Sequence, residues 1–207
     1  MGKPAVLLIT VLLLVLFLIT ALLFVVLVTG VIIYNGVVKA EKQVEEAQAQ
    51  IETLYQRRVD LVPNLVETVK GYAKHESQTF TAVAEARSKA QAVLQQTAGV
   101  NSLSKEQIKA VADSQLELGS TLKGLFAIVE NYPSLRASTN FLTLQDQLEG
   151  TENRITVARE RYNSSVRYYN TKLAVFPSNM IAGSFGFKEK VYFEAKEDAK
   201  DSSKVTF

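Results

Sequence analysis

The single histidine, His75, is the first residue to consider for chemistry, because imidazole is a common metal ligand and general base. It stands beside Glu76, but the chain has no second histidine to complete a His-Glu-x-x-His zinc pair. It also has no cysteine, which excludes thiolate metal sites, disulfides and thiol nucleophiles. We expect His75 to lie on a helix surface and expect neither a metal nor another cofactor. Only a site made of carboxylates stays open.

Paired carboxylates are the next candidates for acid-base chemistry. Glu149 and Glu152 lie three residues apart, on one face of a predicted helix. Such pairs occur on most helix surfaces and indicate catalysis only where a cleft surrounds them. No constellation of a nucleophile and a base is recognisable. The sequence therefore predicts a protein without a catalytic site.

Arg58 occupies a position where an apolar residue is expected. It continues a seven-residue row of Val37, Val44 and Ile51. An arginine on a helix seam either extends to the edge or pairs with a carboxylate. Glu67, Glu149 and Glu152 are the candidate partners. Our hypothesis is a partly buried polar cluster that fixes the register of the helices.

Two Tyr-Asn pairs, Tyr162-Asn163 and Tyr169-Asn170, repeat at a spacing of seven residues. We interpret the tyrosines as core residues whose hydroxyl groups reach polar partners. A contact with a ligand or a protein is the alternative interpretation.

An apolar segment over residues 5–33 contains no charged residue. A membrane-spanning helix needs about 20 predominantly apolar residues, so this segment predicts a single transmembrane helix after a short tail of residues 1–4. A cleaved signal peptide is the competing interpretation, but its apolar part is shorter and ends at small residues. The flanking lysines do not decide the orientation in the membrane.

Residues 34–194 predict a helical domain with seven-residue apolar periodicity. The first helix continues the apolar segment through Asn35-Gly36, although a flexible joint there is the alternative. Pro63 predicts a turn or a kink, and a second helix follows over about residues 64–97. The fold class is thus all-α: an N-terminal single transmembrane helix followed by an antiparallel four-helix bundle.

The third and fourth helices have clear ends. Ser104 and Gln107 form a capping-box pattern at the start of the third helix, and Pro133 closes it. The fourth starts at Ser138 or Thr139 and ends before Pro177. Its apolar row consists of Phe141, Leu148, Ile155, Tyr162, Tyr169 and Phe176. An ordered loop packed on the bundle is expected next, and then a flexible polar tail over residues 195–207.

Several strings of residues resemble the LemA family. They are Tyr34-Asn35, the segment 57–76 that begins Arg57-Arg58-x-Asp60-Leu61-Val62-Pro63-Asn64, Glu130-Asn131-Tyr132-Pro133, the segment 140–155 with Glu149-Gly150-Thr151-Glu152-Asn153-Arg154, Arg159-x-x-Tyr162-Asn163, Tyr169-Asn170 and Phe176-Pro177. The resemblance covers about residues 34–193. Two positions depart from the family pattern, since Gln48 replaces a frequent Trp and Gln56 replaces a basic residue.

The resemblance implies a bacterial, membrane-anchored four-helix bundle without enzymatic activity. Its family-motif residues here are Arg57, Arg58, Asp60, Pro63, Asn64, Tyr132, Pro133, Glu149, Thr151, Glu152, Arg154, Tyr162, Asn163 and Asn170. Lipoprotein-like members of the family imply that the domain lies outside the cytoplasm.

The expected function is that of a membrane-tethered scaffold or adaptor, which binds other envelope proteins or a second copy of itself through helix faces. The alternative is a ligand-sensing bundle tethered to the membrane.

The formal net charge is +2, with 23 basic and 21 acidic residues. A nucleic-acid-binding protein needs a basic surface, so this class is excluded.

Overall fold

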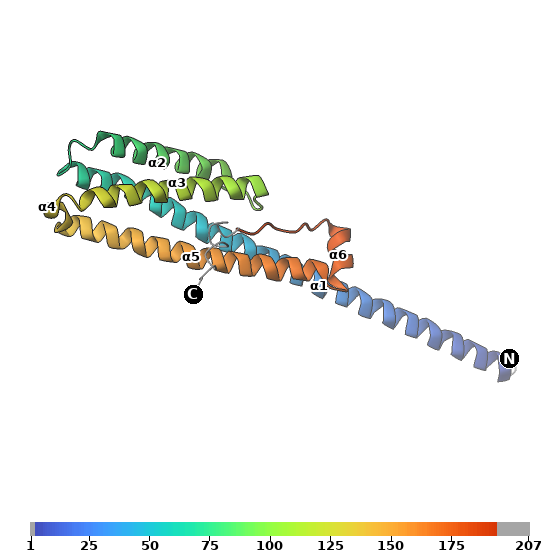
Figure 1. The fold of residues 1–207 in the computed structure, drawn as a ribbon. Helices are drawn as coiled ribbons and strands as arrows, with labels where there is room; N and C mark the ends of the chain where they lie inside the picture. The colour runs from blue at the N-terminus through green and yellow to red at the C-terminus, as the bar shows by residue number, and fades with distance from the viewer. Residues whose placement is uncertain (1–2, 194–207) are drawn as a thin grey trace, which may run out of the picture. The chain divides into compact units, whose positions relative to one another are not determined.

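The computed structural model describes residues 3–193, with side chains from residue 8 onward. Helices occupy most of this range, and no strand occurs within it (Figure 1). In chain order they are α1 (Lys3–Lys70), α2 (Ser77–Thr97), α3 (Lys105–Val129), α4 (Pro133–Arg136), α5 (Thr139–Ala174) and α6 (Ser178–Phe185). The expected all-α class is therefore confirmed. The predicted polar tail over residues 195–207 lies outside the described residues.

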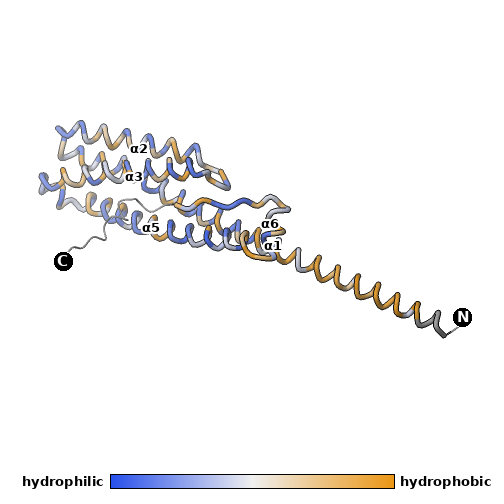
Figure 2. Tube along the Cα trace, turned by 45° about the vertical axis from the view of Figure 1, so that its right-hand side comes forward, coloured by the Kyte–Doolittle hydropathy of each residue, from blue (hydrophilic) through white to orange (hydrophobic). Residues whose placement is uncertain are grey.

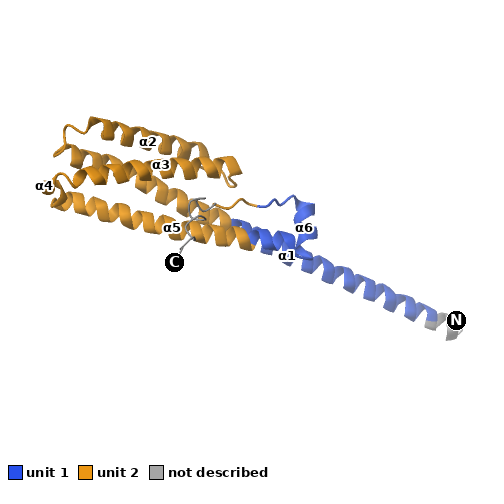
Figure 3. Cartoon of the chain, viewed as in Figure 1, with its two compact units in different colours: residues 1–42, 169–189 blue, residues 43–168, 190–207 orange. Residues whose placement is uncertain are grey.

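The described residues form two compact units (Figure 3). One unit contains residues 3–42 and 169–189, and the other contains residues 43–168 and 190–193. Both α1 and α5 contribute residues to each unit. The first unit buries Val37, Ala40, Tyr169 and Ala182.

The N-terminal part of α1 is apolar on all sides (Figure 2). Its leucine, valine, isoleucine and phenylalanine side chains from residue 8 to residue 32 are exposed. The helix is long and apolar enough to cross a membrane. It also continues through Asn35 and Gly36 without a break, as expected.

The expectation of a turn at Pro63, with a second helix from about residue 64, is wrong, because α1 runs on to Lys70 and the chain turns over residues 71–76. A proline inside a helix removes one backbone hydrogen bond and costs about 3 kcal/mol or more. Val62, Leu65 and Val69 are fully buried, and each contributes roughly 1.5–3 kcal/mol. Their burial offsets the proline, so the second helix begins at Ser77 instead of near residue 64.

In the second unit, α2, α3 and the parts of α1 and α5 that belong to it lie side by side (Figure 1). Their apolar rows are buried largely as the seven-residue pattern predicts. The core of this unit includes Val44, Ile51, Val83, Leu118, Leu125, Leu148 and Ile155.

The pattern fails over the middle of α1. Ile51, Tyr55 and Val59 are buried at two successive spacings of four residues, which rotates the buried face of the helix. Leu54 and Leu61, which were expected in the core, are only half-buried as a result. The same rotation places Arg58 beside the core rather than within it.

The expected capping box of α3 is confirmed. The Gln107 backbone amide donates to Ser104 Oγ at 3.2 Å, and the Ser104 amide donates to Gln107 Oε1 at 2.8 Å. Pro133 does more than end this region, since it is the first residue of the short helix α4. At the start of α5, the Leu142 amide donates to the Ser138 carbonyl oxygen at 3.0 Å, in agreement with the expected start.

The prediction of a loop directly after Pro177 is wrong, because Ser178–Phe185 is helix α6. Gly186 ends α6 with a φ of 75°, a left-handed conformation that glycine adopts without strain. Phe176 was expected in the apolar row of α5, but α5 ends at Ala174 and the Phe176 side chain is 78% exposed. The residues after α6 form no regular structure up to residue 193.

Candidate functional site

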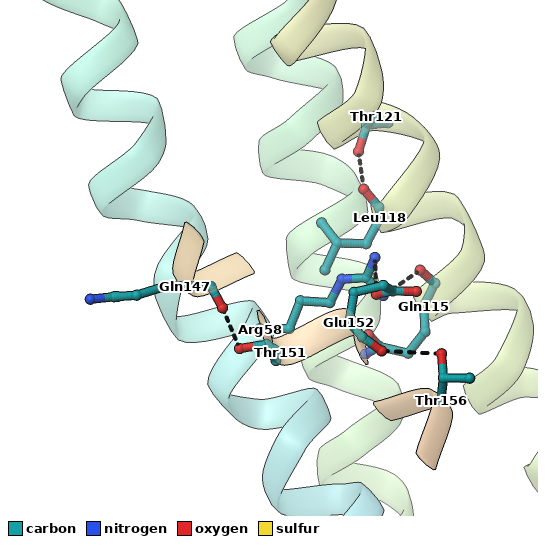
Figure 4. A network of polar contacts seen from close by, with 8 residues as sticks. All are labelled: Arg58, Gln115, Leu118, Thr121, Gln147, Thr151, Glu152 and Thr156. Atoms are coloured by element: carbon teal, nitrogen blue, oxygen red, sulfur yellow. Dashed lines mark hydrogen bonds and ion pairs between the residues drawn. The ribbon is translucent and has the colours of Figure 1, made fainter. Parts of the chain in front are cut away.

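Arg58 extends from α1 to two other helices of the second unit (Figure 4). Its Nη2 lies 2.9 Å from Glu152 Oε2 on α5, and its Nη1 donates to the Gln115 carbonyl oxygen on α3 at 3.5 Å. The Arg58 side chain is 12% exposed and that of Glu152 is 53% exposed. Of the three carboxylates that the sequence offered, Glu152 is the one that pairs with Arg58.

Gly119 on α3 makes this approach sterically possible. A Cβ atom at Gly119 would lie 2.8 Å from Arg58 Nη2, well inside van der Waals contact. The glycine therefore lets the guanidinium group lie directly against the α3 backbone. We call Arg58, Gln115, Gly119 and Glu152 the Arg58 cluster.

Gln115 is the exceptional member of the Arg58 cluster. Its side chain is buried, yet within the described part of the chain its amide nitrogen and oxygen have no hydrogen-bonding partner. A buried polar group without a partner costs about 1–3 kcal/mol. Sequence periodicity correctly predicted that Gln115 lies on the core row, but it gave no partner for the amide.

Hydroxyl groups near the cluster are satisfied locally. Thr151 Oγ1 donates to the Gln147 carbonyl oxygen at 2.7 Å, and Thr156 Oγ1 donates to that of Glu152 at 3.2 Å (Figure 4). The buried Tyr55 has a raised pKa, chiefly because burial disfavours its charged form, while the charges of Arg159 and Arg58 partly oppose the shift. These hydroxyl groups therefore complete polar contacts of the fold.

The first Tyr-Asn pair binds the chain after α6. Tyr162 Oη donates to the Val191 carbonyl oxygen at 2.9 Å. Asn163 Nδ2 donates to the Phe193 carbonyl oxygen, and the Phe193 amide donates to Asn163 Oδ1, both at 2.9 Å. The Phe193 ring packs edge-on against Tyr162, with the Arg159 guanidinium 5.5 Å from the ring centre. The expected packing of this segment on the helices is thus observed at residues 191–193.

The other predicted residues lie apart from the Arg58 cluster. Asp60 accepts from Gln56 Nε2 at 2.7 Å, and Arg57, Asp60 and Asn64 line a shallow groove between α1 and α2. Glu149 accepts from Gln145 at 2.9 Å, and Tyr132 Oη donates to Glu76 Oε1 at 3.2 Å. Asn170 is half-buried in the first unit. The structure does not bring these residues together into one cleft.

His75 is exposed in the connection between α1 and α2, not on a helix as expected. Among the described residues, no group of three or more His, Cys, Asp or Glu side chains has the geometry to hold a metal ion.

A second groove runs along the surface between α1 and α5, and sequence reasoning did not find it. Apolar side chains and two arginines are among the residues that line it. We call it the α1–α5 groove, and its lining residues are Gln50, Thr53, Leu54, Asn153, Arg154, Val157, Ala158 and Arg161. No signal for it is present in the sequence, because the seven-residue pattern placed Leu54 in the core and its half-burial follows only from how the helices pack.

The elements define the class of the protein: it is all-helical over the described residues and has a long apolar N-terminal helix. The chain belongs to the LemA family, whose sequence profile matches residues 47–207.

Curated relatives support this assignment. The chain is 27% identical over 177 residues to Magnetosome protein MamQ 2 of Paramagnetospirillum magneticum and, at the same identity and length, to Magnetosome protein MamQ of Magnetospirillum gryphiswaldense. Each alignment covers 79% of this chain and 65% of the relative, so the chain spans less than two thirds of those proteins. It is also 23% identical over 163 residues to Protein LemA of Metamycoplasma hominis, covering 79% of this chain and 69% of that protein.

Proposed function

We propose that the chain is a membrane-anchored adaptor of the bacterial envelope, which binds a second protein through a helix face. The proposal rests mainly on the continuity of α1. One helix contains both an exposed apolar segment of membrane-spanning length and a row of residues, including Val44, Ile51 and Val59, that is buried in the second unit. The same element can therefore serve as an anchor and as part of a folded binding domain.

Retention of the apolar segment is part of this proposal. A cleaved signal peptide would leave the rest of the chain at the end of the apolar region. Here the helix continues past that region, and Val37 and Ala40, only a few residues further on, are buried in the first unit. The proposal places the second unit outside the cytoplasm, as the LemA resemblance implies. Protease treatment of intact spheroplasts tests that side, since a cytoplasmic domain would stay protected.

We interpret the helices of the second unit as an antiparallel four-helix bundle. Short connections over residues 71–76 and 98–104 join α1 to α2 and α2 to α3, and short connections favour antiparallel neighbours. A bundle presents grooves between adjacent helices on its outside. These grooves are the surfaces on which a partner helix packs.

We assign partner binding to the α1–α5 groove. Two of its lining residues are apolar and accessible: Val157 is 46% exposed, and Leu54 is half-buried. Arg154 and Arg161 line the groove, and no acidic side chain does. An amphipathic helix with acidic flanks has the complementary apolar and charged surface. The Arg58 cluster and the contacts of Asn163 occur within the chain, so neither is the surface that we assign to the partner.

Site-specific photocrosslinking in intact membranes tests the assignment. A photoreactive residue at Val157 should yield one discrete adduct, and the double variant Arg154→Glu, Arg161→Glu should abolish it. Leu116 on α3 provides the matched control, because it is also apolar and is 47% exposed. Equal adducts from both positions, or an adduct that survives charge reversal, would show that the groove is not the binding surface.

A further inference from the structure

Helix α6 leaves large apolar side chains without cover. Within α6, Met180 is 65% exposed and Phe185 is also exposed, and Val175 and Phe176 are exposed in the residues just before the helix. No charged residue occurs between Lys172 and Lys188, so this face lies within an uncharged stretch that two lysines flank. Several large apolar side chains exposed within one short segment of a folded protein mark a place where something else binds.

The position of α6 in the first unit indicates what covers this face. A Cβ atom at Gly30 of α1 would lie 3.9 Å from Ile181 Cδ1, so α6 packs beside the end of the apolar segment. The ring of Tyr34 lies 4.8 Å from that of Phe185 and 5.8 Å from that of Phe187, measured between centroids. Helix α6 also lies across α1 instead of along it (Figure 1).

Chemical groups follow one another in a definite order along this part of α1. The apolar segment ends at Ile33, and the aromatic contacts occur at Tyr34. Lys172 Nζ then donates to the Gly36 carbonyl oxygen at 3.1 Å, and Lys39 follows on α1. At 1.5 Å per residue, the step from Gly30 to Lys39 covers about 13 Å. Hydrocarbon, aromatic rings and cationic groups succeed one another in this order at a membrane surface.

We infer that α6 is an interfacial helix, which inserts its apolar face into the boundary between the lipid headgroups and the acyl chains of the membrane that α1 spans. The inference rests on the proposed membrane anchoring of α1. A helix that lies across a spanning helix is parallel to the membrane plane, and it buries one face in this boundary region. Lys39 and Lys172 lie where headgroup phosphates are found. The chain thus contacts the bilayer at two places that are far apart in sequence.

Fluorescence quenching by brominated lipids tests the inference directly, because the chain contains no tryptophan. The full chain is reconstituted into phosphatidylcholine–phosphatidylglycerol vesicles as three variants, each with one tryptophan. Met180→Trp reports on α6, Phe17→Trp reports on the apolar segment, and Leu116→Trp reports on an exposed apolar position of α3. Met180, Phe17 and Leu116 are exposed, so the substitutions leave the packing intact.

Met180→Trp should emit at shorter wavelength than Leu116→Trp, and bromines near the headgroups should quench it more than bromines near the bilayer centre. Phe17→Trp should show the opposite depth preference. If bromines quench Phe17→Trp while Met180→Trp responds only to aqueous iodide, the inference that α6 is interfacial is wrong, but the proposed membrane anchoring by α1 is supported. If bromines quench neither variant, the proposed membrane anchoring by α1 is wrong as well. A Met180→Trp signal shielded from both iodide and bromine would show that protein covers α6, which overturns the inference.

Discussion

Arg87 on α2 donates a hydrogen bond from Nε to the carbonyl oxygen of Val59 on α1, at 3.2 Å. Val59 lies four residues before Pro63, so its carbonyl is the group that the missing proline N–H leaves without a helical partner. A side chain of the neighbouring helix therefore replaces the lost backbone hydrogen bond. Together with the burial of the apolar side chains around the proline, this contact accounts for the continuation of α1 to Lys70.

The relationship predicts a coupling between Arg87 and Pro63. Arg87→Met should lower the free energy of unfolding by about 1–3 kcal/mol, because it leaves a part-buried carbonyl without a donor. In a Pro63→Ala background the alanine N–H bonds the same carbonyl, and Arg87→Met should cost clearly less. Urea unfolding of the four proteins in detergent gives the double-mutant cycle. If Arg87→Met costs the same in both backgrounds, Arg87 does not replace the hydrogen bond that the proline lacks.

The close approach of Arg58 to Gly119 predicts different effects for two glycines of α3. Gly124→Ala meets no atom within 4 Å, so it should gain the helix propensity of alanine, about 1 kcal/mol. Gly119→Ala should gain less, because its Cβ displaces the Arg58 guanidinium from Glu152. Urea unfolding measures both changes. The deficit of Gly119→Ala should vanish in an Arg58→Ala background, and its persistence there would show that Arg58 is not the cause.

The unsatisfied amide of Gln115 predicts a stabilising substitution. Gln115→Leu keeps a similar volume and removes two buried polar atoms without partners, so the free energy of unfolding should rise by about 1–3 kcal/mol. Gln107→Leu is the matched control on the same helix. It removes the side-chain half of the capping box, the acceptor of the Ser104 amide, and should lower stability. A loss of stability in Gln115→Leu would mean that the amide has a partner in solution.

The burial of Tyr162 predicts a loss of stability at high pH. Burial raises the pKa of Tyr162 to about 12 from the ordinary value of 10.0. Since the folded pKa is the higher one, the contribution is fully present below pH 10 and is lost as the pH rises from 10 to 12.

Two variants show whether Tyr162 is responsible for this fall in the free energy of unfolding. Tyr162→Phe should show a shallower fall of unfolding free energy across this interval than the unaltered chain. Tyr72→Phe, at an exposed tyrosine, should leave the slope unchanged. Identical slopes in all three proteins would assign the decline to other groups, among them Tyr169, whose pKa burial also raises to about 12.

Sequence periodicity predicted the helical class, the apolar segment and most core residues, because these follow from the spacing of apolar side chains along a helix. It misplaced the end of α1, since a local rule for proline takes no account of a donor such as Arg87 that arrives from another helix. It named Glu152 as one of three partners for Arg58 but could not select it, because that choice depends on how α5 packs. The role of Gly119 and the α1–α5 groove likewise arise only from packing.

The central claim is that the apolar segment of α1 is retained and holds the chain in a membrane. Alkaline extraction of cell membranes, followed by intact-mass measurement of the extracted pellet, tests it most directly. We expect the full-length mass of the chain in the pellet. Release into the supernatant, or a mass that lacks the residues up to about the end of the apolar segment, would contradict it.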